Sequence, residues 1–270
     1  MKIYSLMLVK DEEDIIASTL CAAAQWSDKL FVMDNGSSDD TWEIVNDLAA
    51  EFPNIIPFAQ ESQPFRIGLR AIMFEQFKSE MTENDWWCIR LDADEFFHDD
   101  PRHFLKNIPL KYKQVYKASI DFALTDEDIS EYNFTGTFEN DRDKIRYYQP
   151  YTWSEVRFMR HSRKLNWEID EFKPKPCGLI YPIQIKALHY QFRSPQQMLK
   201  RHIVRQKAKA DGCGSFKHEK GESWKDYLKQ RAELSYYNND NTFQILGNRN
   251  KFNKKHIYFL KSILTFLGYY

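Results

Sequence analysis

Short apolar runs alternate with stretches of helical periodicity over the first third of the chain. The apolar runs have the length of strands and cover residues 3–9, 30–33, 55–58 and 86–91. Between them, apolar side chains recur every three or four residues, which predicts helices over 15–24, 42–52 and 67–77. Strands and helices in this alternation predict an α/β fold with a mostly parallel central sheet flanked by helices.

The pattern changes after this first part. Between 111 and 189 the chain is rich in aromatic and charged residues, with strand-like pieces at 115–122 and 147–159. A further alternating segment predicts a strand that leads to His189. Helical periodicity returns at 195–210 and 224–234, and again near the C-terminus.

These shifts divide the chain. We expect one α/β domain over 1–205, made of a half 1–100 and a mixed half 101–205, followed by a helical C-terminal extension over 206–270. The sequence shows no internal repeat.

Two polar clusters follow strands of the predicted sheet. The turn formers Asp34 to Thr41 come after the second strand, and Asp92 to Glu95 after the fourth. Ligands of such sheets bind beyond the carboxyl ends of the strands, so the topology brings both clusters to the edge where ligands bind.

The pair Asp92 and Asp94 offers two carboxylates at a strand end. Oxygen ligands without a nearby cysteine favour Mg²⁺ or Mn²⁺, although a plain acidic exit from a strand explains the same residues equally well. A calcium-binding EF-hand loop is excluded, because Phe96 and Phe97 stand where that loop needs an oxygen ligand and a glycine.

The cluster that begins at Asp34 combines a carboxylate, a turn glycine and hydroxyl groups near a helix N-terminus. Such a group of residues suits the base and ribose of a nucleotide. A type I turn with an ordinary helix cap is the alternative.

Composition narrows the classes of function. The chain has 270 residues, 38 Lys and Arg against 39 Asp and Glu, and a formal net charge of -1, so we expect no nucleic-acid partner. Its four cysteines, Cys21, Cys88, Cys177 and Cys213, are far apart, which favours reduced thiols in a cytoplasmic protein. No apolar run reaches the roughly 20 residues of a membrane span, and none has the flanks of a secretory signal.

Three motifs occur in a recognisable order: a first strand followed by K-D-E-E, the D-N-G-S-S-D-D-T turn, and W-W-C-I-R-L-D-A-D-E-F. Over residues 1–100 the chain resembles the family 2 glycosyltransferases of the GT-A fold, and more narrowly bacterial members that act on cell-envelope polysaccharides. The resemblance implies a GT-A-like fold whose first half binds a nucleotide-sugar donor and whose second half binds a glycan or lipid-linked acceptor. It also implies a metal-dependent, inverting hexosyl transfer.

The resemblance assigns roles to residues of the donor half. The end of the first strand and the following turn hold the nucleotide in that family, which implies Val9, Asp34, Asn35 and Gly36. The D-x-D motif holds a divalent cation on the donor diphosphate, which implies Asp94 as a metal ligand.

The resemblance also assigns two further residues of this half to the donor site. Asp92 is assigned to the nucleotide. Arg70 matches a position where relatives place an arginine near the donor phosphates, and a solvated helix arginine is the alternative. Mn²⁺ or Mg²⁺ is the expected cofactor, and a UDP-sugar is the favoured donor.

The acceptor half carries weaker similarity. The stretch Trp167–Glu171 resembles an acceptor-side W-x-x-x-H-E motif, with Asp170 where relatives carry histidine. An inverting transfer needs a base for the acceptor hydroxyl, and we expect Glu171, or else Asp170, to serve. His189 lies in a segment that resembles a later H-Y motif, and we expect it to be a further metal ligand; a strand histidine bonded to backbone is the alternative.

Two other functions remain open at this point. An aspartate-nucleophile phosphohydrolase also places D-x-D at a strand end, but normally on the first strand and with Thr or Val where this chain has Phe96. A non-catalytic nucleotide-sugar-binding protein on the same scaffold is the second alternative.

The C-terminal segment from Lys254 to Leu267 has apolar residues at helical spacing after a basic start. It predicts either a helix packed on the core or in a homodimer, which we favour, or a peripheral anchor at the inner face of the cytoplasmic membrane.

Overall fold

The computed structural model describes residues 1–62, 65–149, 154–210, 221–240, 242–244 and 255–270. Cys213 and Lys254, named above, lie outside these ranges. The chain forms two compact units: unit 1 comprises Met1–Ser119, Trp153–Leu188 and Gly247–Tyr270, and unit 2 comprises Ile120–Thr152 and His189–Leu246. The predicted domain limits, 1–205 and 206–270, stay a prediction.

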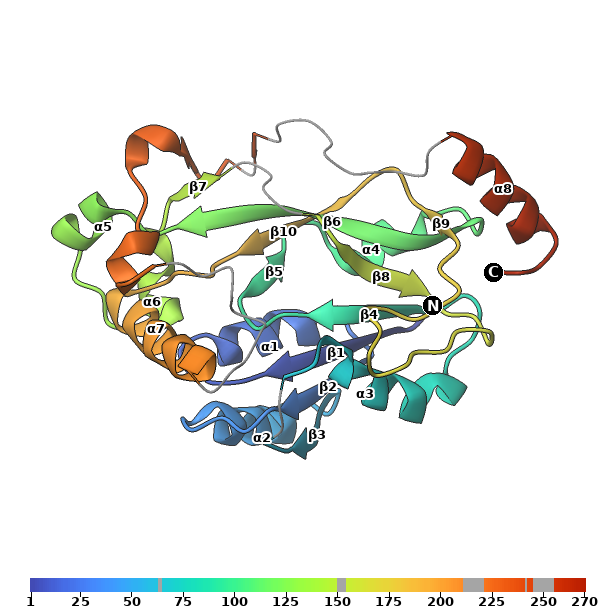
Figure 1. The fold of residues 1–270 in the computed structure, drawn as a ribbon, viewed down its shortest axis with the longest axis horizontal. Coiled ribbons are helices and arrows are strands. Elements are labelled where there is room, and N and C mark those ends of the chain that lie inside the picture. The colour runs from blue at the N-terminus through green and yellow to red at the C-terminus, as the bar shows by residue number, and fades with distance from the viewer. Residues whose placement is uncertain (63–64, 150–153, 211–220, 241, 245–254) are drawn as a thin grey trace. The chain divides into compact units, whose positions relative to one another are not determined.

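A parallel sheet forms the first part of unit 1 (Figure 1). Its strands are β1 (Ile3–Val9), β2 (Lys29–Asp34), β3 (Ile55–Gln60) and β4 (Trp86–Leu91), in the spatial order β3-β2-β1-β4. The sheet continues with β8 (Val156–Arg160), which is antiparallel to β4, and then with β6 (Tyr112–Ala123), which is antiparallel to β8. The short strand β9 (Leu179–Ile180) is parallel to β6, and β10 (Ile185–His189) pairs with β5 (Glu95–Phe97) and with β6.

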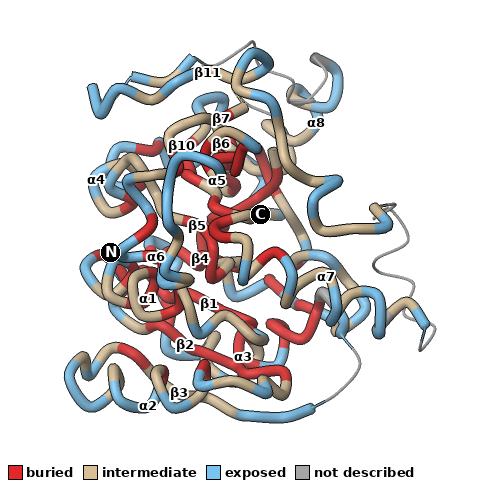
Figure 2. The backbone as a smooth tube through the Cα atoms, turned by 90° about the vertical axis from the view of Figure 1, so that its left-hand side faces the viewer, coloured by how far each residue is buried: buried red, intermediate tan, exposed pale blue. Residues whose placement is uncertain are grey.

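Both faces of this sheet are buried. Successive side chains of a strand point to opposite faces, and apolar residues of the same strands pack into a core cluster on each face. In β1, Ile3, Met7 and Val9 pack on one side, while Tyr4, Leu6 and Leu8 pack on the other. Figure 2 shows β1 and β2 buried along most of their length. Continuous burial of this kind explains why the strands appear in the sequence as apolar runs.

Helices cover the two faces of the sheet. The helices α1 (Ile16–Ala24), α2 (Thr41–Glu51) and α4 (Pro101–Lys106) contribute apolar side chains to the first face, and α3 (Arg70–Phe77) to the second. Short 3₁₀ turns, Ile67–Leu69 and Lys78–Glu80, stand at either end of α3. The C-terminal helix α8 (Lys255–Phe266) also belongs to unit 1.

Unit 2 has its own aromatic core. Phe122 at the end of β6 stacks on Tyr190 with ring centroids 4.5 Å apart, and Tyr237 stacks on Phe243 at 4.8 Å. Around them lie the strands β7 (Tyr147–Gln149) and β11 (Ser235–Tyr236), the helices α5 (Asp126–Glu131), α6 (Phe138–Asp141) and α7 (Pro195–Ala210), and the 3₁₀ turns Arg142–Lys144, Trp224–Tyr227 and Arg231–Glu233.

The structure confirms the predicted α/β class and nearly all of the predicted elements. The sheet is parallel across β3-β2-β1-β4, and beyond β4 it is mixed, because β8 and β6 join it in antiparallel pairs. The helix predicted over 224–234 is wrong, because that segment holds two 3₁₀ turns separated by extended backbone. Ser223 and Asp226 form a capping box that starts the first turn, and a parallel bridge between Lys229 and Thr125 holds the following residues in extended form. Among the described residues, no helix is long and apolar enough to cross a membrane.

Candidate functional site

The loops that follow β1 and β2 are joined to each other at the carboxyl end of the sheet. Val9 pairs with Asp34 in the register of the two strands. The Asp11 carboxylate accepts a hydrogen bond from the Ser38 backbone at 2.7 Å, and the Ser37 hydroxyl accepts one from the Asp11 backbone at 2.9 Å. These contacts fix the turn in which the predicted nucleotide-binding residues lie.

Two buried oxygens of this turn are left without hydrogen bonds. Asp34 is fully buried, and its Oδ1 accepts a bond from the Ser37 backbone at 2.7 Å. Its Oδ2, and Oδ1 of Asn35, have no hydrogen-bond partner among the described residues. Since unpaired buried acceptors cost free energy, these two oxygens are suited to receive donors from a ligand.

The glycine of the turn is required by its backbone. Gly36 has φ +77°, and a Cβ atom there would lie 2.7 Å from the Cβ of Ser62. Both the left-handed conformation and the close approach of residue 62 exclude a side chain. Only glycine at position 36 allows the backbone of the turn to lie this close to Ser62.

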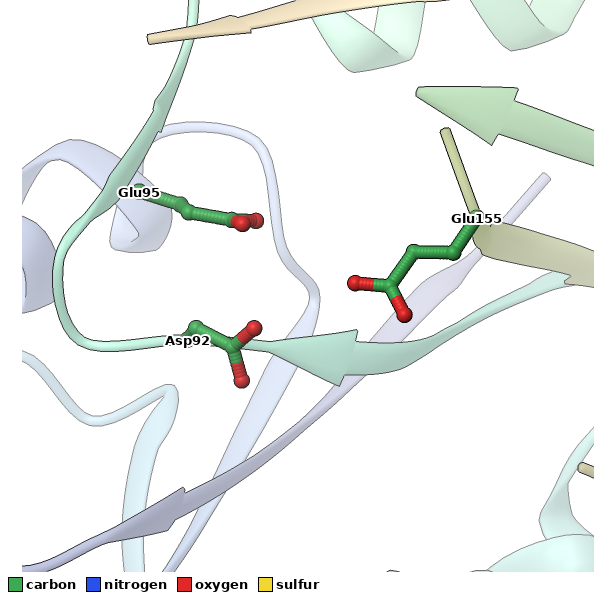
Figure 3. Close-up of side chains that lie close together, drawn as sticks. All are labelled: Asp92, Glu95 and Glu155. Carbon is green, nitrogen blue, oxygen red and sulfur yellow. The ribbon is translucent and has the colours of Figure 1, made fainter. Parts of the chain in front are cut away.

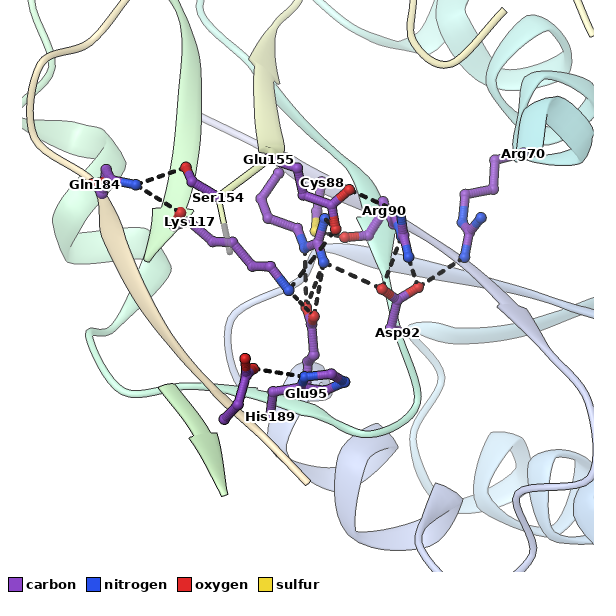
Figure 4. A network of polar contacts seen from close by, with 12 residues as sticks. Arg70, Cys88, Arg90, Asp92, Glu95, Lys117, Ser154, Glu155, Gln184 and His189 are labelled. Carbon is purple, nitrogen blue, oxygen red and sulfur yellow. Dashed lines mark hydrogen bonds and ion pairs between the residues drawn. The ribbon is translucent and has the colours of Figure 1, made fainter. Parts of the chain in front are cut away.

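The first aspartate of the D-x-D motif is held by three arginines (Figure 4). The guanidinium of Arg90 lies 2.8 Å from Asp92, that of Arg70 lies 3.0 Å away, and that of Arg157 lies 3.2 Å away. Burial would raise the pKa of the Asp92 carboxyl, but Arg90, Arg157 and Arg70 hold this pKa well below its ordinary value. Asp92 is thus an ionised carboxylate in a fixed position.

Behind Asp92 lies a buried cluster of acids and bases. Arg157 donates to Glu95 at 2.8 Å through Nη2, and its Nη1 lies 2.6 Å from Glu155 as an ion pair without hydrogen-bond geometry. Lys117 also donates to Glu95. Burial lowers the pKa of Arg157, but the neighbouring carboxylates outweigh it and raise this pKa.

Three carboxylates of this cluster converge, as Figure 3 shows, and have oxygens within 4.8 Å of one another: Asp92, Glu95 and Glu155. Oxygen donors suit Mg²⁺ or Mn²⁺. Four cationic side chains contact the same three acids, however: Arg70, Arg90, Lys117 and Arg157. A dication would have to displace them, so the cluster as it stands fits an ion pair network better than a metal.

The second acid of the motif, Asp94, lies in the turn between β4 and β5 and is 8% exposed. Its carboxylate has the hard oxygens that Mg²⁺ and Mn²⁺ prefer, so it fits the expected cofactor by its chemistry. Asp94 belongs to unit 1 and His189 to unit 2, and their shared ligation of a metal stays a prediction. Within unit 2, the Nδ1 atom of His189 lies 2.8 Å from the carboxylate of Asp121.

Arg70 is buried, with an exposed fraction of 4%, and stands at the start of α3. Burial lowers its pKa to about 10, against the opposing effect of Asp92, so the guanidinium remains charged at neutral pH. Its Nε has no hydrogen-bond partner among the described residues. The expected contact with the donor phosphates remains a prediction.

The loop with the two candidate bases is seated on α3 and on the turn before it. The Trp167 backbone donates to Glu75 at 3.0 Å, and the Trp167 ring packs edge-on against Phe74. A Cβ atom on Gly68 would lie 1.9 Å from the carbonyl oxygen of Ile169, so the loop approaches to a distance that only glycine permits.

The candidate bases themselves differ in environment. The Glu171 carboxylate lies 2.7 Å from Lys175, and its side chain is 40% exposed. The Asp170 side chain is 85% exposed, with Arg66 at 3.8 Å. Their predicted role is not tested by these contacts.

Sequence reasoning missed Arg90 and Arg157, which hold Asp92, and the partners of these arginines and of Lys117, namely Glu95 and Glu155. It also missed Asp121 beside His189. The sequence feature that could have revealed them is a charged residue inside an apolar strand, as in V-R-F-M-R at 156–160. Such charges are normally expected at the surface, and only the packing of β4, β6 and β8 brings these together.

Comparison with known proteins gives a family and two similar structures. The profile described as "Glycosyl transferase family 2" matches residues 6–174. No curated protein matches the chain. The chain is similar to the mannosyltransferase PcManGT from Pyrobaculum calidifontis, solved with GDP-Man and Mn²⁺, at 12% identity and a TM-score of 0.39, with 82% of this chain and 65% of that one covered. It is also similar to HddC from Yersinia pseudotuberculosis, at 10% identity and a TM-score of 0.35, with 74% and 97% covered.

This chain thus spans less than two thirds of the length of the mannosyltransferase. Both TM-scores are below 0.5. The assignment of the fold class therefore depends on the family match and on the observed sheet. They confirm the expected GT-A-like fold class.

Proposed function

Because the chain belongs to glycosyl transferase family 2, we propose that it moves a hexosyl group from a nucleotide-sugar donor to a hydroxyl group of a glycan or lipid-linked acceptor. The observation that carries this proposal is the pair of unpaired buried oxygens on Asp34 and Asn35 at the carboxyl end of β2. Ribose hydroxyls and a base N–H, such as the imino N–H of uracil, are donors that would pair with them. A UDP-sugar is our favoured donor.

Val9, Gly36 and Asp92 complete the proposed nucleotide site. Asp92, ionised and held by three arginines, would accept bonds from donor hydroxyls without moving. Arg70 would turn its unpaired Nε to a donor phosphate. A divalent ion, Mn²⁺ or Mg²⁺, held by Asp94 and His189, would neutralise the leaving nucleoside diphosphate when bound.

We propose an inverting reaction. The acceptor oxygen forms a bond to the anomeric carbon while the bond from that carbon to the diphosphate oxygen breaks, and the acceptor proton passes to a carboxylate. Glu171 is our first choice for this base, since Trp167 and Gly68 hold its loop on α3. The carboxylate must first leave Lys175. Asp170 is the second choice.

The proposed acceptor suggests where in the cell the reaction takes place. We place the reaction in the cytoplasm, in the assembly of bacterial cell-envelope polysaccharides, where a lipid-linked acceptor lies at the inner face of the cytoplasmic membrane. The family match favours this reaction over a phosphohydrolase. Asp92, the residue a phosphohydrolase would use as nucleophile, is occupied by three guanidinium groups.

One assay separates the three functions. The full chain is incubated with Mn²⁺, without acceptor, in separate reactions with a panel of UDP- and GDP-sugars and with simple phosphoesters. The products are separated, and binding of each nucleotide sugar is measured by calorimetry. Slow release of nucleoside diphosphate and free sugar supports the proposal. Phosphate release from simple phosphoesters would favour the phosphohydrolase, and tight binding without turnover would favour a non-catalytic binding protein.

A further inference from the structure

The C-terminal helix α8 turns its apolar side chains to solvent and its polar side chains to the rest of unit 1. The exposed fractions are 90% for Phe266, 69% for Phe259 and 57% for Leu260. On the opposite side, Lys261 Nζ donates to the Gly178 carbonyl at 2.9 Å, and the Tyr258 hydroxyl bonds with Tyr112. A helix packed on a core normally has the reverse arrangement.

The exposed residues form one continuous stripe. Residues 256, 259, 260, 263, 266 and 267 are all exposed, while 258, 261, 262 and 265 are not, which is the periodicity of a helix. Figure 1 shows α8 in red beside β9, which it contacts. We call the side chains of Phe259, Leu260, Ile263, Phe266 and Leu267 the apolar face. An apolar face of this kind on a single helix indicates an interaction site.

The charge of the surrounding sequence identifies the partner. Residues 241–270 contain no Asp or Glu but five basic residues. Lys261 faces the protein, and the other four, Arg249, Lys251, Lys254 and Lys255, precede or begin the helix in the sequence. A basic segment beside an apolar face suits an anionic lipid surface. A second copy of this chain would bring the same positive charges together and is therefore disfavoured.

The length of α8 fixes how it would lie. Its 12 residues give a helix of about 18 Å, well short of the roughly 30 Å of a bilayer core. We infer that α8 lies in the plane of an anionic lipid bilayer, with its apolar face among the acyl chains. This surface is separate from the proposed sugar transfer and does not depend on it.

Flotation with vesicles tests this inference on the full chain. Vesicles of phosphatidylcholine alone are compared with vesicles that contain phosphatidylglycerol, at low and high salt. We expect at least tenfold stronger binding to the anionic vesicles at low salt, and loss of that difference at high salt. The double variant Phe259→Ser/Phe266→Ser should bind at least tenfold more weakly, while Ile183→Ser, which alters an apolar side chain 57% exposed outside α8, should bind like the wild type.

Three results would overturn the inference: no binding of the wild type to anionic vesicles, equal binding by the double variant, or a wild-type dimer in sedimentation that the double variant dissociates without any vesicle binding. Thermal unfolding of both variants is measured alongside. A double variant that is unfolded is replaced by Leu260→Gln, for which the same tenfold weakening is expected.

Discussion

At the scale of single residues, the candidate site contains two kinds of polar group. Asp92 is held by three arginines, so it is fixed in position and charged before any ligand arrives. Asp34 and Asn35 instead each keep an unpaired oxygen. A site of this kind can bind a polar ligand with little rearrangement of its side chains, because its charges are already fixed and its unpaired oxygens are ready to accept hydrogen bonds.

Asp34→Ala should weaken the binding of a nucleoside diphosphate even in the absence of metal. A hydrogen bond to a charged group contributes roughly 1.5–3 kcal/mol, which corresponds to a loss of affinity of about tenfold to a hundredfold. Calorimetric titration with UDP and EDTA measures it. Asp47→Ala, an exposed change on α2, is the control, and equal affinity in both variants would contradict the assignment of Asp34.

Arg157→Met should strongly destabilise the fold. The change leaves Glu95, Glu155 and Asp92 with fewer cations in a buried cluster, and breaking a buried pair in this way costs about 3–5 kcal/mol. Urea unfolding of the two proteins gives the difference in free energy. Arg66→Met removes an exposed arginine from unit 1 and should cost less than about 1 kcal/mol; a similar small cost for Arg157→Met would refute the structural role.

Stability should fall as the pH drops below the ordinary histidine range, partly through His161. Burial lowers the pKa of His161, whose Nδ1 accepts the indole N–H of Trp87 at 3.1 Å. Below about pH 6.5 the unfolded chain binds a proton that the folded chain does not, so folding loses free energy there. The free energy of unfolding is measured from pH 8 to 5.5 for the wild type, His161→Gln and the exposed control His103→Gln. Parallel curves for all three would exclude this contribution.

At the scale of elements, hydrophobic periodicity was a good guide wherever burial is continuous. The strands β1, β2 and β4 are apolar on both faces and were predicted within one or two residues. The segment 224–234 has helical spacing but lies at the surface of unit 2, where the capping box and the bridge to Thr125 decide its backbone. Local polar contacts of this kind outweigh a weak periodic pattern.

Gly68→Ala should displace the loop with the candidate bases and leave the sheet intact. Its Cβ would collide with the carbonyl of Ile169, which is backbone and cannot rotate away. We expect kcat/KM to fall at least tenfold, because small displacements of a reacting group are costly. Ile72→Ala, on the exposed side of α3, is the matched control. Unchanged kcat/KM in the glycine variant would show that the loop takes no part in the reaction.

At the scale of the whole molecule, the sequence was sufficient for the class of fold and for the edge of the sheet at which polar residues gather. Asp34 and Asp92 could be placed there because each follows an apolar run that can only be a buried strand. The network around Asp92 could not be predicted, since Arg157 and Lys117 lie far from it in sequence and reach it only through the pairing of β8 with β4 and β6. The same holds for α8, whose spacing is that of an ordinary core helix until its contacts show which side faces the protein.

If Asp94 supports metal-dependent turnover of a nucleotide sugar, a Mn²⁺ titration of donor hydrolysis should separate the wild type from Asp94→Ala. We expect wild-type turnover to rise with Mn²⁺. The variant should lose several orders of magnitude of rate at every Mn²⁺ concentration, because it lacks the charge that stabilises the leaving group. The nucleotide should still bind to the variant in EDTA, through Asp34. Full turnover by Asp94→Ala, with an unchanged Mn²⁺ requirement, would contradict the account.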